Sequence, residues 1–134
     1  MGKIRHIALS SPDPFATAEF YKAAFDLKEV GRFEQGSNPF GFGVYLTDGV
    51  INLAILKLLT PQGTRAPDFV GIHHLGLLVD DVDTKREELE RLGAVCFQQR
   101  PSADKSMFFE TKFVGPDDVV FDISEHPWPL GSKE

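Results

Sequence analysis

The fold is decided by two similar stretches of sequence, IRHIALSSPDP at residues 4–14 and GIHHLGLLVDDVD at residues 71–83. In each, an apolar strand-like segment containing histidine is followed by a turn whose aspartate can cap a helix. Setting His6 on His74, an offset of 68 residues (74 − 6), also aligns the aspartates of the two turns. The offset is about half of the 134-residue chain, so the pattern predicts an internal duplication.

Apolar spacing predicts the other elements around these two stretches. In the first half we expect a strand at 4–10, a helix at 14–25, and strands at 42–47 and 50–57, the last two joined by a tight Asp48-Gly49 turn. In the second half we expect a strand at 71–79, a helix at 84–92, and strands at 94–98, 106–114 and 119–124.

The two halves together predict a single α+β domain over residues 1–134. Repeat one spans about 3–57, a Pro- and Gly-containing connector spans 58–70, and repeat two spans about 71–125. Each repeat is a βαβββ unit. One unit alone is too short for a well-stocked core, so we expect the two to pack side by side.

Charge and cysteine content exclude several function classes. Fourteen basic and twenty acidic residues give a formal net charge of −6, which argues against a nucleic-acid or anionic-membrane surface. The single cysteine, Cys96, excludes an internal disulfide and a cysteine-rich zinc module. The sequence contains no apolar run of about 18 residues and no signal-peptide pattern. We therefore expect a cytoplasmic protein that acts on a small molecule.

Alternation along the predicted strands selects the candidate metal ligands. Side chains alternate between the two faces of a strand, and in four strands one face carries large apolar residues. The opposite faces carry one coordinating residue each, with small neighbours: His6, Asn52, His74 and Asp122. Two imidazoles, an amide oxygen and a carboxylate suit a divalent metal. Taken alone, each residue is more often structural, as a hydrogen-bonded histidine, a hairpin asparagine or a solvated aspartate.

Other residues complete the predicted site. His73 faces away from His74 and is expected to be structural or to orient that ring. Glu110 and Glu125 are acid–base candidates, although a solvated position is the simpler interpretation. Phe33, Phe40 and Phe42 flank a Gly-rich stretch and are predicted to line a substrate pocket.

The order and spacing of these motifs resemble the vicinal oxygen chelate superfamily, which includes glyoxalase I, methylmalonyl-CoA epimerase, extradiol dioxygenases and the fosfomycin and bleomycin resistance proteins. The resemblance runs from residue 3 to about 125. It rests on His6-Ile7-Ala8-Leu9, Glu19-Phe20-Tyr21, Asp48-Gly49, His73-His74-Leu75-Gly76, and Gly115-Pro116-Asp117 leading to Asp122. It implies a glyoxalase-like fold, in which two repeats form an open, cup-shaped mixed sheet around one site.

The resemblance also implies a ligand set and a chemistry. The family's four metal positions fall on His6, Asn52, His74 and Asp122, where Asn52 and Asp122 replace the usual glutamate or glutamine and glutamate. The implied cofactor is a divalent ion: zinc, nickel, cobalt, manganese or iron. The implied function is a metal-dependent lyase or isomerase of the glyoxalase type, with Asp122 as ligand and catalytic base.

Two alternatives remain beside this function. His6, His74 and Asp122 also form the two-histidine, one-carboxylate set of an iron-dependent extradiol-type dioxygenase. A non-catalytic small-molecule binder of the drug-resistance type would need no metal. The resemblance further implies a homodimer.

Overall fold

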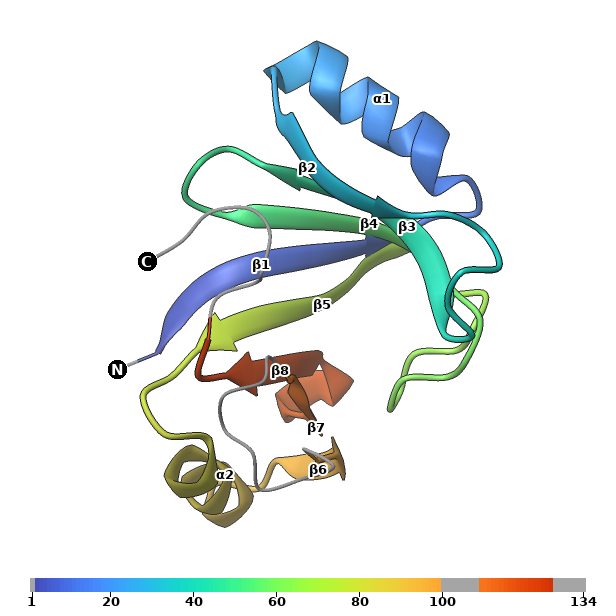
Figure 1. The fold of residues 1–134 in the computed structure, drawn as a ribbon. Coiled ribbons are helices and arrows are strands. Elements are labelled where there is room, and N and C mark those ends of the chain that lie inside the picture. The colour runs from blue at the N-terminus through green and yellow to red at the C-terminus, as the bar shows by residue number, and fades with distance from the viewer. Residues whose placement is uncertain (1, 100–108, 127–134) are drawn as a thin grey trace.

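The computed structural model describes residues 2–99 and 109–126, which form one open, mixed eight-stranded sheet with two helices (Figure 1). The strand order is β2-β3-β4-β1-β5-β8-β7-β6. The elements are β1 Lys3–Ser10, α1 Pro14–Phe25, β2 Lys28–Phe33, β3 Gly41–Thr47, β4 Asn52–Leu58, β5 Gly71–Leu78, α2 Val82–Arg91, β6 Val95–Gln98, β7 Thr111–Val114 and β8 Val120–Ser124. This architecture confirms the predicted glyoxalase-like α+β fold.

The centre of the sheet joins the two halves of the chain. β1 and β5 run antiparallel side by side, and in their register His6 pairs with Gly76 and Ala8 pairs with His74. On its other edge β1 is parallel to β4, just as β5 is parallel to β8. The two halves are therefore related by an approximate two-fold axis that passes between β1 and β5.

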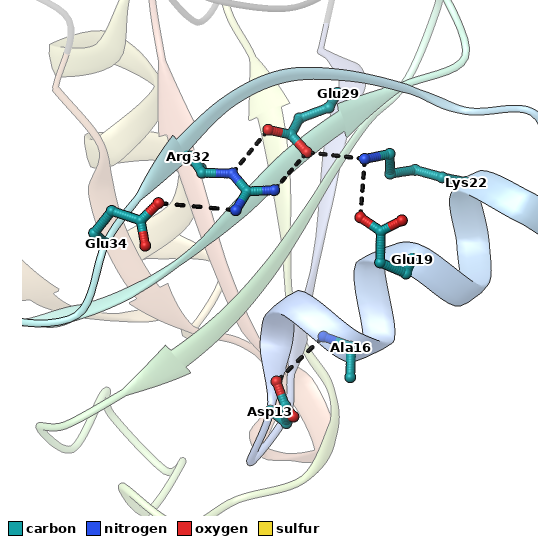
Figure 2. Close-up of polar contacts among 7 residues, drawn as sticks. All are labelled: Asp13, Ala16, Glu19, Lys22, Glu29, Arg32 and Glu34. Atoms are coloured by element: carbon teal, nitrogen blue, oxygen red, sulfur yellow. Dashed lines mark hydrogen bonds and ion pairs between the residues drawn. The ribbon is translucent and has the colours of Figure 1, made fainter.

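The first half buries the outer face of its strands under α1, which lies across the β2–β4 end of the sheet in Figure 1. Ala18 of the helix packs against Val44 and Ile55 of the sheet. Pro14 occupies the first turn, and the Asp13 carboxylate accepts a hydrogen bond from the Ala16 amide at 3.2 Å (Figure 2). These signals explain why the predicted and observed helix bounds agree.

The second half repeats the arrangement with α2. Val82 packs with Phe113 and Ile123 in a second core cluster, and the Asp81 carboxylate caps the helix by accepting from the Thr84 amide at 3.0 Å. With both helices on the outer face, the inner face of every central strand is left to line a cavity.

The helix predicted at 84–92 begins two residues earlier in the structure, because its cap is Asp81. The βαβββ unit requires a third strand after the helix of the first half, which was not located in the sequence. This strand is β2, an edge strand of charged and mostly exposed residues with no apolar alternation. Of the strand expected at 106–114, β7 accounts for the end, and residues 106–108 lie outside the described residues. Within the described ranges, no helix has the length and apolar character needed to cross a membrane.

Candidate metal centre

Three of the four predicted ligands meet on the inner face of the sheet. His6 comes from β1, His74 from β5 and Asp122 from β8, and all three are at least 94% buried. Their potential ligand atoms lie within 4.8 Å of one another. Register explains the convergence, because Gly76 pairs with both His6 and Asp122 and its missing side chain leaves room for the His6 ring.

The Asp122 carboxylate stands between the two imidazoles. Its Oδ2 lies 3.4 Å from His6 Nε2 and 3.2 Å from His74 Nε2. This oxygen is buried and has no hydrogen-bond partner in the part of the chain that the structure describes. A buried carboxylate oxygen without a partner is costly, and a cation shared with two ring nitrogens would satisfy it. The residues present therefore fit a divalent metal ion.

Burial and charge act against each other at these groups. Burial alone would raise the pKa of Asp122, but the imidazoles of His6 and His74 outweigh it and hold that pKa below its usual range. Burial lowers the pKa of His6, whereas Asp122 and then Glu110 raise it, with a net increase above 6.5. The site therefore favours an ionised Asp122, which is the form that binds a cation.

His73 fixes the orientation of the His74 ring, as the sequence suggested. Their Nδ1 atoms are 2.7 Å apart, so one ring donates a hydrogen bond and the other accepts it. Burial, together with the neighbouring His74, lowers the pKa of His73 to about 3, so this ring is neutral and can accept. With the hydrogen on His74 Nδ1, the Nε2 lone pair of His74 faces Asp122 and is available to a metal.

The fourth predicted ligand, Asn52, occupies a different register position. In the second half, the residue two positions after His74 is Gly76, and Gly76 pairs with Asp122. In the first half, the residue two positions after His6 is Ala8, and Ala8 pairs with Ala54. The two-fold equivalent of Asp122 is therefore Ala54, which lines the cavity. Asn52 is 2% exposed and pairs with His6 itself. A ligand role for Asn52 stays a prediction.

Glu110, an acid–base candidate in the sequence, lies on the wall of the cavity beside His6. Its Oε2 lies 3.5 Å from His6 Nε2, and its side chain lines the cavity and is 22% exposed. Across the cavity, burial and then the Glu110 charge raise the pKa of Tyr45 to about 12. Tyr45 therefore keeps its hydroxyl proton at neutral pH and can act as a donor. Glu110 is two residues before Lys112, so in an extended chain the two side chains share a face. This alternation was the signal available in the sequence.

A cavity of about 760 Å³ is lined by two of the three converging predicted ligands, His6 and His74. Its polar end carries His6, His74, Glu110 and Lys112. Its walls are mostly apolar and include Phe33, Phe40, Phe42, Leu56, Leu58 and Phe109. The prediction that the three phenylalanines of the Gly-rich stretch line a pocket is confirmed. The volume suits a ligand with a substantial apolar part rather than a three-carbon metabolite.

Comparison with known proteins gives a family match and a set of structural neighbours. The family model described as Glyoxalase/Bleomycin resistance protein/Dioxygenase superfamily matches residues 3–123. A comparison with curated proteins found no match.

Three solved structures illustrate the likeness of fold. A hypothetical protein from Bacillus halodurans C-125 has a TM-score of 0.69 and 18% identity, with 99% of this chain and 96% of that chain covered. Streptomyces coelicolor methylmalonyl-CoA epimerase, a variant in complex with 2-nitronate-propionyl-CoA, has a TM-score of 0.67 and 21% identity, covering 97% and 94%. Methylmalonyl-CoA epimerase from Mycobacterium tuberculosis has a TM-score of 0.67 and 13% identity, covering 98% and 88%. At these identities the likeness shows the fold.

Proposed function

Because the chain belongs to the Glyoxalase/Bleomycin resistance protein/Dioxygenase superfamily, we propose that it is a metal-dependent lyase or isomerase of the glyoxalase type. Its substrate carries two adjacent oxygen atoms. One observation carries the proposal: the buried Oδ2 of Asp122 lies between the Nε2 atoms of His6 and His74 and has no hydrogen-bond partner among the described residues. Zinc, nickel, cobalt, manganese and iron all accept this combination of nitrogen and oxygen ligands.

A divalent ion held by these residues would act as a Lewis acid on the substrate oxygens. The chain supplies the proton transfer. Asp122 was the predicted base, but its carboxylate is 1% exposed and faces both imidazoles. Glu110 has the same chemistry and lines the cavity, so we assign it the role of moving the proton to and from carbon. Tyr45 donates a hydrogen bond to a substrate oxygen that gains negative charge.

Metal content and proton exchange test the proposal together. Protein from metal-supplemented medium is analysed by elemental mass spectrometry, with His74→Ala as the comparison. We expect near-stoichiometric metal in the wild type and its loss in the variant. In deuterated water, the metal-loaded wild type should exchange the carbon-bound hydrogens of 2-oxo-4-phenylbutanoate beside the carbonyl.

A matched pair of variants assigns the base. Glu110→Gln should keep its metal and lose exchange by about 100-fold or more, the range for a general base. The exposed Glu34→Gln should exchange at the wild-type rate. If the wild type binds metal but catalyses no exchange, the metal site is supported and the isomerase assignment is wrong. No metal above background in the wild type would favour a non-catalytic binding protein.

One observation favours a second function, an extradiol-type dioxygenase. With Ala54 at the equivalent of Asp122, the ligands reduce to two histidines and one carboxylate, the set typical of non-haem iron oxygenases. Loading with ferrous iron under anaerobic conditions, followed by oxygenated catechol, decides between the two. Consumption of dioxygen that depends on catechol and on His74 would replace the isomerase assignment.

A cytoplasmic homodimer is part of the same proposal, in keeping with the family resemblance. Light scattering after size-exclusion chromatography measures the oligomeric state. A single species with the mass of a monomer would contradict the proposed dimer and would not bear on the metal site.

A further inference from the structure

Lys112 is an almost buried cation on the wall of the cavity. Its side chain is 12% exposed, and in the β7–β8 register it pairs with Asp122, so both side chains belong to the inner face. In the approximate two-fold relation its counterpart is Tyr45, which pairs with Ala54. The polar end of the cavity therefore has a cation on one side and a neutral hydroxyl on the other.

The ammonium group of Lys112 has few hydrogen-bond acceptors near it among the described residues. The nearest carboxylate oxygen is Glu110 Oε1 at 3.8 Å, which is beyond hydrogen-bonding distance. None of the residues at 2–99 or 109–126 accepts a hydrogen bond from this Nζ. The side chain lines the cavity, so its three N–H donors are available to an oxyanion that enters the cavity.

The charges at this end of the cavity specify the charge of that oxyanion. Asp122 and Glu110 contribute −2 and Lys112 contributes +1, while both ligand imidazoles are neutral when they bind a metal. A divalent ion brings the sum to +1 (−2 + 1 + 2). A ligand with a single negative charge neutralises the site, whereas a neutral ligand leaves one buried positive charge without a partner.

We propose that Lys112 is a specificity-determining residue that binds the carboxylate of the substrate. The substrate class is a monocarboxylate with an oxygen on the adjacent carbon and an aromatic or branched apolar tail, as in aryl or alkyl 2-oxo and 2-hydroxy acids. The tail packs against the walls formed by Phe33, Phe40, Phe42, Leu56 and Leu58. The adjacent oxygen and the single negative charge rest on the proposed function, because the charge sum includes the ion; the contact with Lys112 and the apolar tail rest on the cavity.

Matched anionic and neutral probes test this assignment. The first pair is 2-oxo-4-phenylbutanoate and its primary amide; the second is 4-phenylbutanoate and its amide, which lack the second oxygen. Binding is measured by titration calorimetry on the wild type, Lys112→Met and Lys112→Arg. The exposed Lys57→Met, on β4, is the control for the loss of one positive charge from the protein.

We expect Lys112→Met to weaken binding of the acids by about 10-fold or more and binding of the amides by less than about 2-fold, as for loss of a charge-assisted hydrogen bond. Lys112→Arg should keep most of the preference for acids, and Lys57→Met all of it. In the wild type, each acid should bind more tightly than its amide; this needs no variant and so does not depend on how Lys112→Met folds.

Equal losses for acids and amides in Lys112→Met, or unchanged acid binding, would overturn the proposal and make Lys112 only a neutraliser of Glu110. The second probe pair separates this failure from failure of the proposed function. Without bound metal, 2-oxo-4-phenylbutanoate would bind no better than 4-phenylbutanoate. The affinity for 4-phenylbutanoate relative to the affinity for its amide would still fall in Lys112→Met, because the variant removes the same positive charge.

Discussion

Gly76 lies against the imidazole of His6, and at this residue the shape of the metal centre depends on a missing side chain. A Cβ at position 76 would overlap the His6 ring atoms. Gly76→Ala should therefore displace His6, lower the metal affinity by about 10- to 100-fold, and destabilise the fold by about 1–3 kcal/mol. Metal titration and urea unfolding measure the two effects.

A double-mutant cycle isolates the cause. In a His6→Ala background the clash is absent, so Gly76→Ala should cost less than about 0.5 kcal/mol there. An equal cost in both backgrounds would place the strain in the β1–β5 backbone rather than in the His6 ring.

The contact between His73 and His74 provides a test of the proposed metal centre. His73→Leu keeps a buried side chain of similar size, but removes the 2.7 Å Nδ1–Nδ1 hydrogen bond that orients His74. We expect the metal affinity to fall by about 10- to 100-fold, as for other outer hydrogen-bond partners of metal ligands. Ile72→Ala, at the exposed neighbouring position, should bind metal like the wild type. Unchanged affinity in His73→Leu would mean that packing alone holds the His74 ring.

Alternation in the sequence predicts which face of a strand a candidate ligand occupies, but not its register against the neighbouring strand. Alternation placed His6, His74 and Asp122 on the inner face, and the structure brings them together. Alternation does not distinguish Asn52 from Ala54, which share that face; hydrogen-bond register between strands does. The offset of 68 residues, applied to Asp122, gives position 54 (122 − 68), so the duplication in the sequence also indicates Ala54 as the equivalent of Asp122.

Among the elements, α1 and β2 show what local sequence does and does not encode. α1 has a capping Asp13 and Pro14, signals that act within one turn. β2 has neither apolar alternation nor turn signals, and its position is secured by tertiary contacts. The Glu29 carboxylate of β2 accepts two hydrogen bonds of 2.8 Å from Arg32 and one of 3.1 Å from Lys22 of α1, which also contacts Glu19 (Figure 2). These contacts were not predictable from spacing.

This ion-pair group makes the α1–β2 contact sensitive to acid. The Arg32 guanidinium lowers the pKa of Glu29 to about 2 from an ordinary 4.5; burial opposes the shift and Lys22 adds to it. A lowered pKa in the folded state stabilises the protein above pH 4.5, and this contribution is lost as the pH falls from 4.5 to 2. The effect is small because the pair is near the surface.

Glu29→Gln removes the titrating group and should flatten that part of the stability curve. Urea midpoints at pH 5 and pH 3 measure the difference, and the wild type should lose more stability than the variant over this interval. In 0.5 M NaCl the two proteins should become more alike. A variant with the same acid sensitivity as the wild type would assign it to other carboxylates.

At the scale of the whole molecule, the candidate metal centre spans the boundary between the two halves. His6 belongs to the first half, and His74 and Asp122 belong to the second. The β1–β5 pairing brings the two halves together, and the β5–β8 pairing places Asp122 beside His74. The duplication thus builds one site from two units. The halves then diverge at equivalent positions: Ala54 and Tyr45 of the first half take the places that Asp122 and Lys112 take in the second.

A metal that binds both halves binds the folded chain and not the unfolded one, so it should stabilise the whole domain. At a free metal concentration 100 times the dissociation constant, linkage gives about 2.7 kcal/mol, or roughly 5–15 °C in Tm for a domain of this size. Calorimetry should show this shift in the wild type, its reversal by a chelator, and no shift in His74→Ala. An equal shift in His74→Ala would mean that the ion binds elsewhere. A wild type that holds stoichiometric metal without any shift would mean that the unfolded chain binds it equally well, which three ligands separated by more than 40 residues along the sequence make unfavourable.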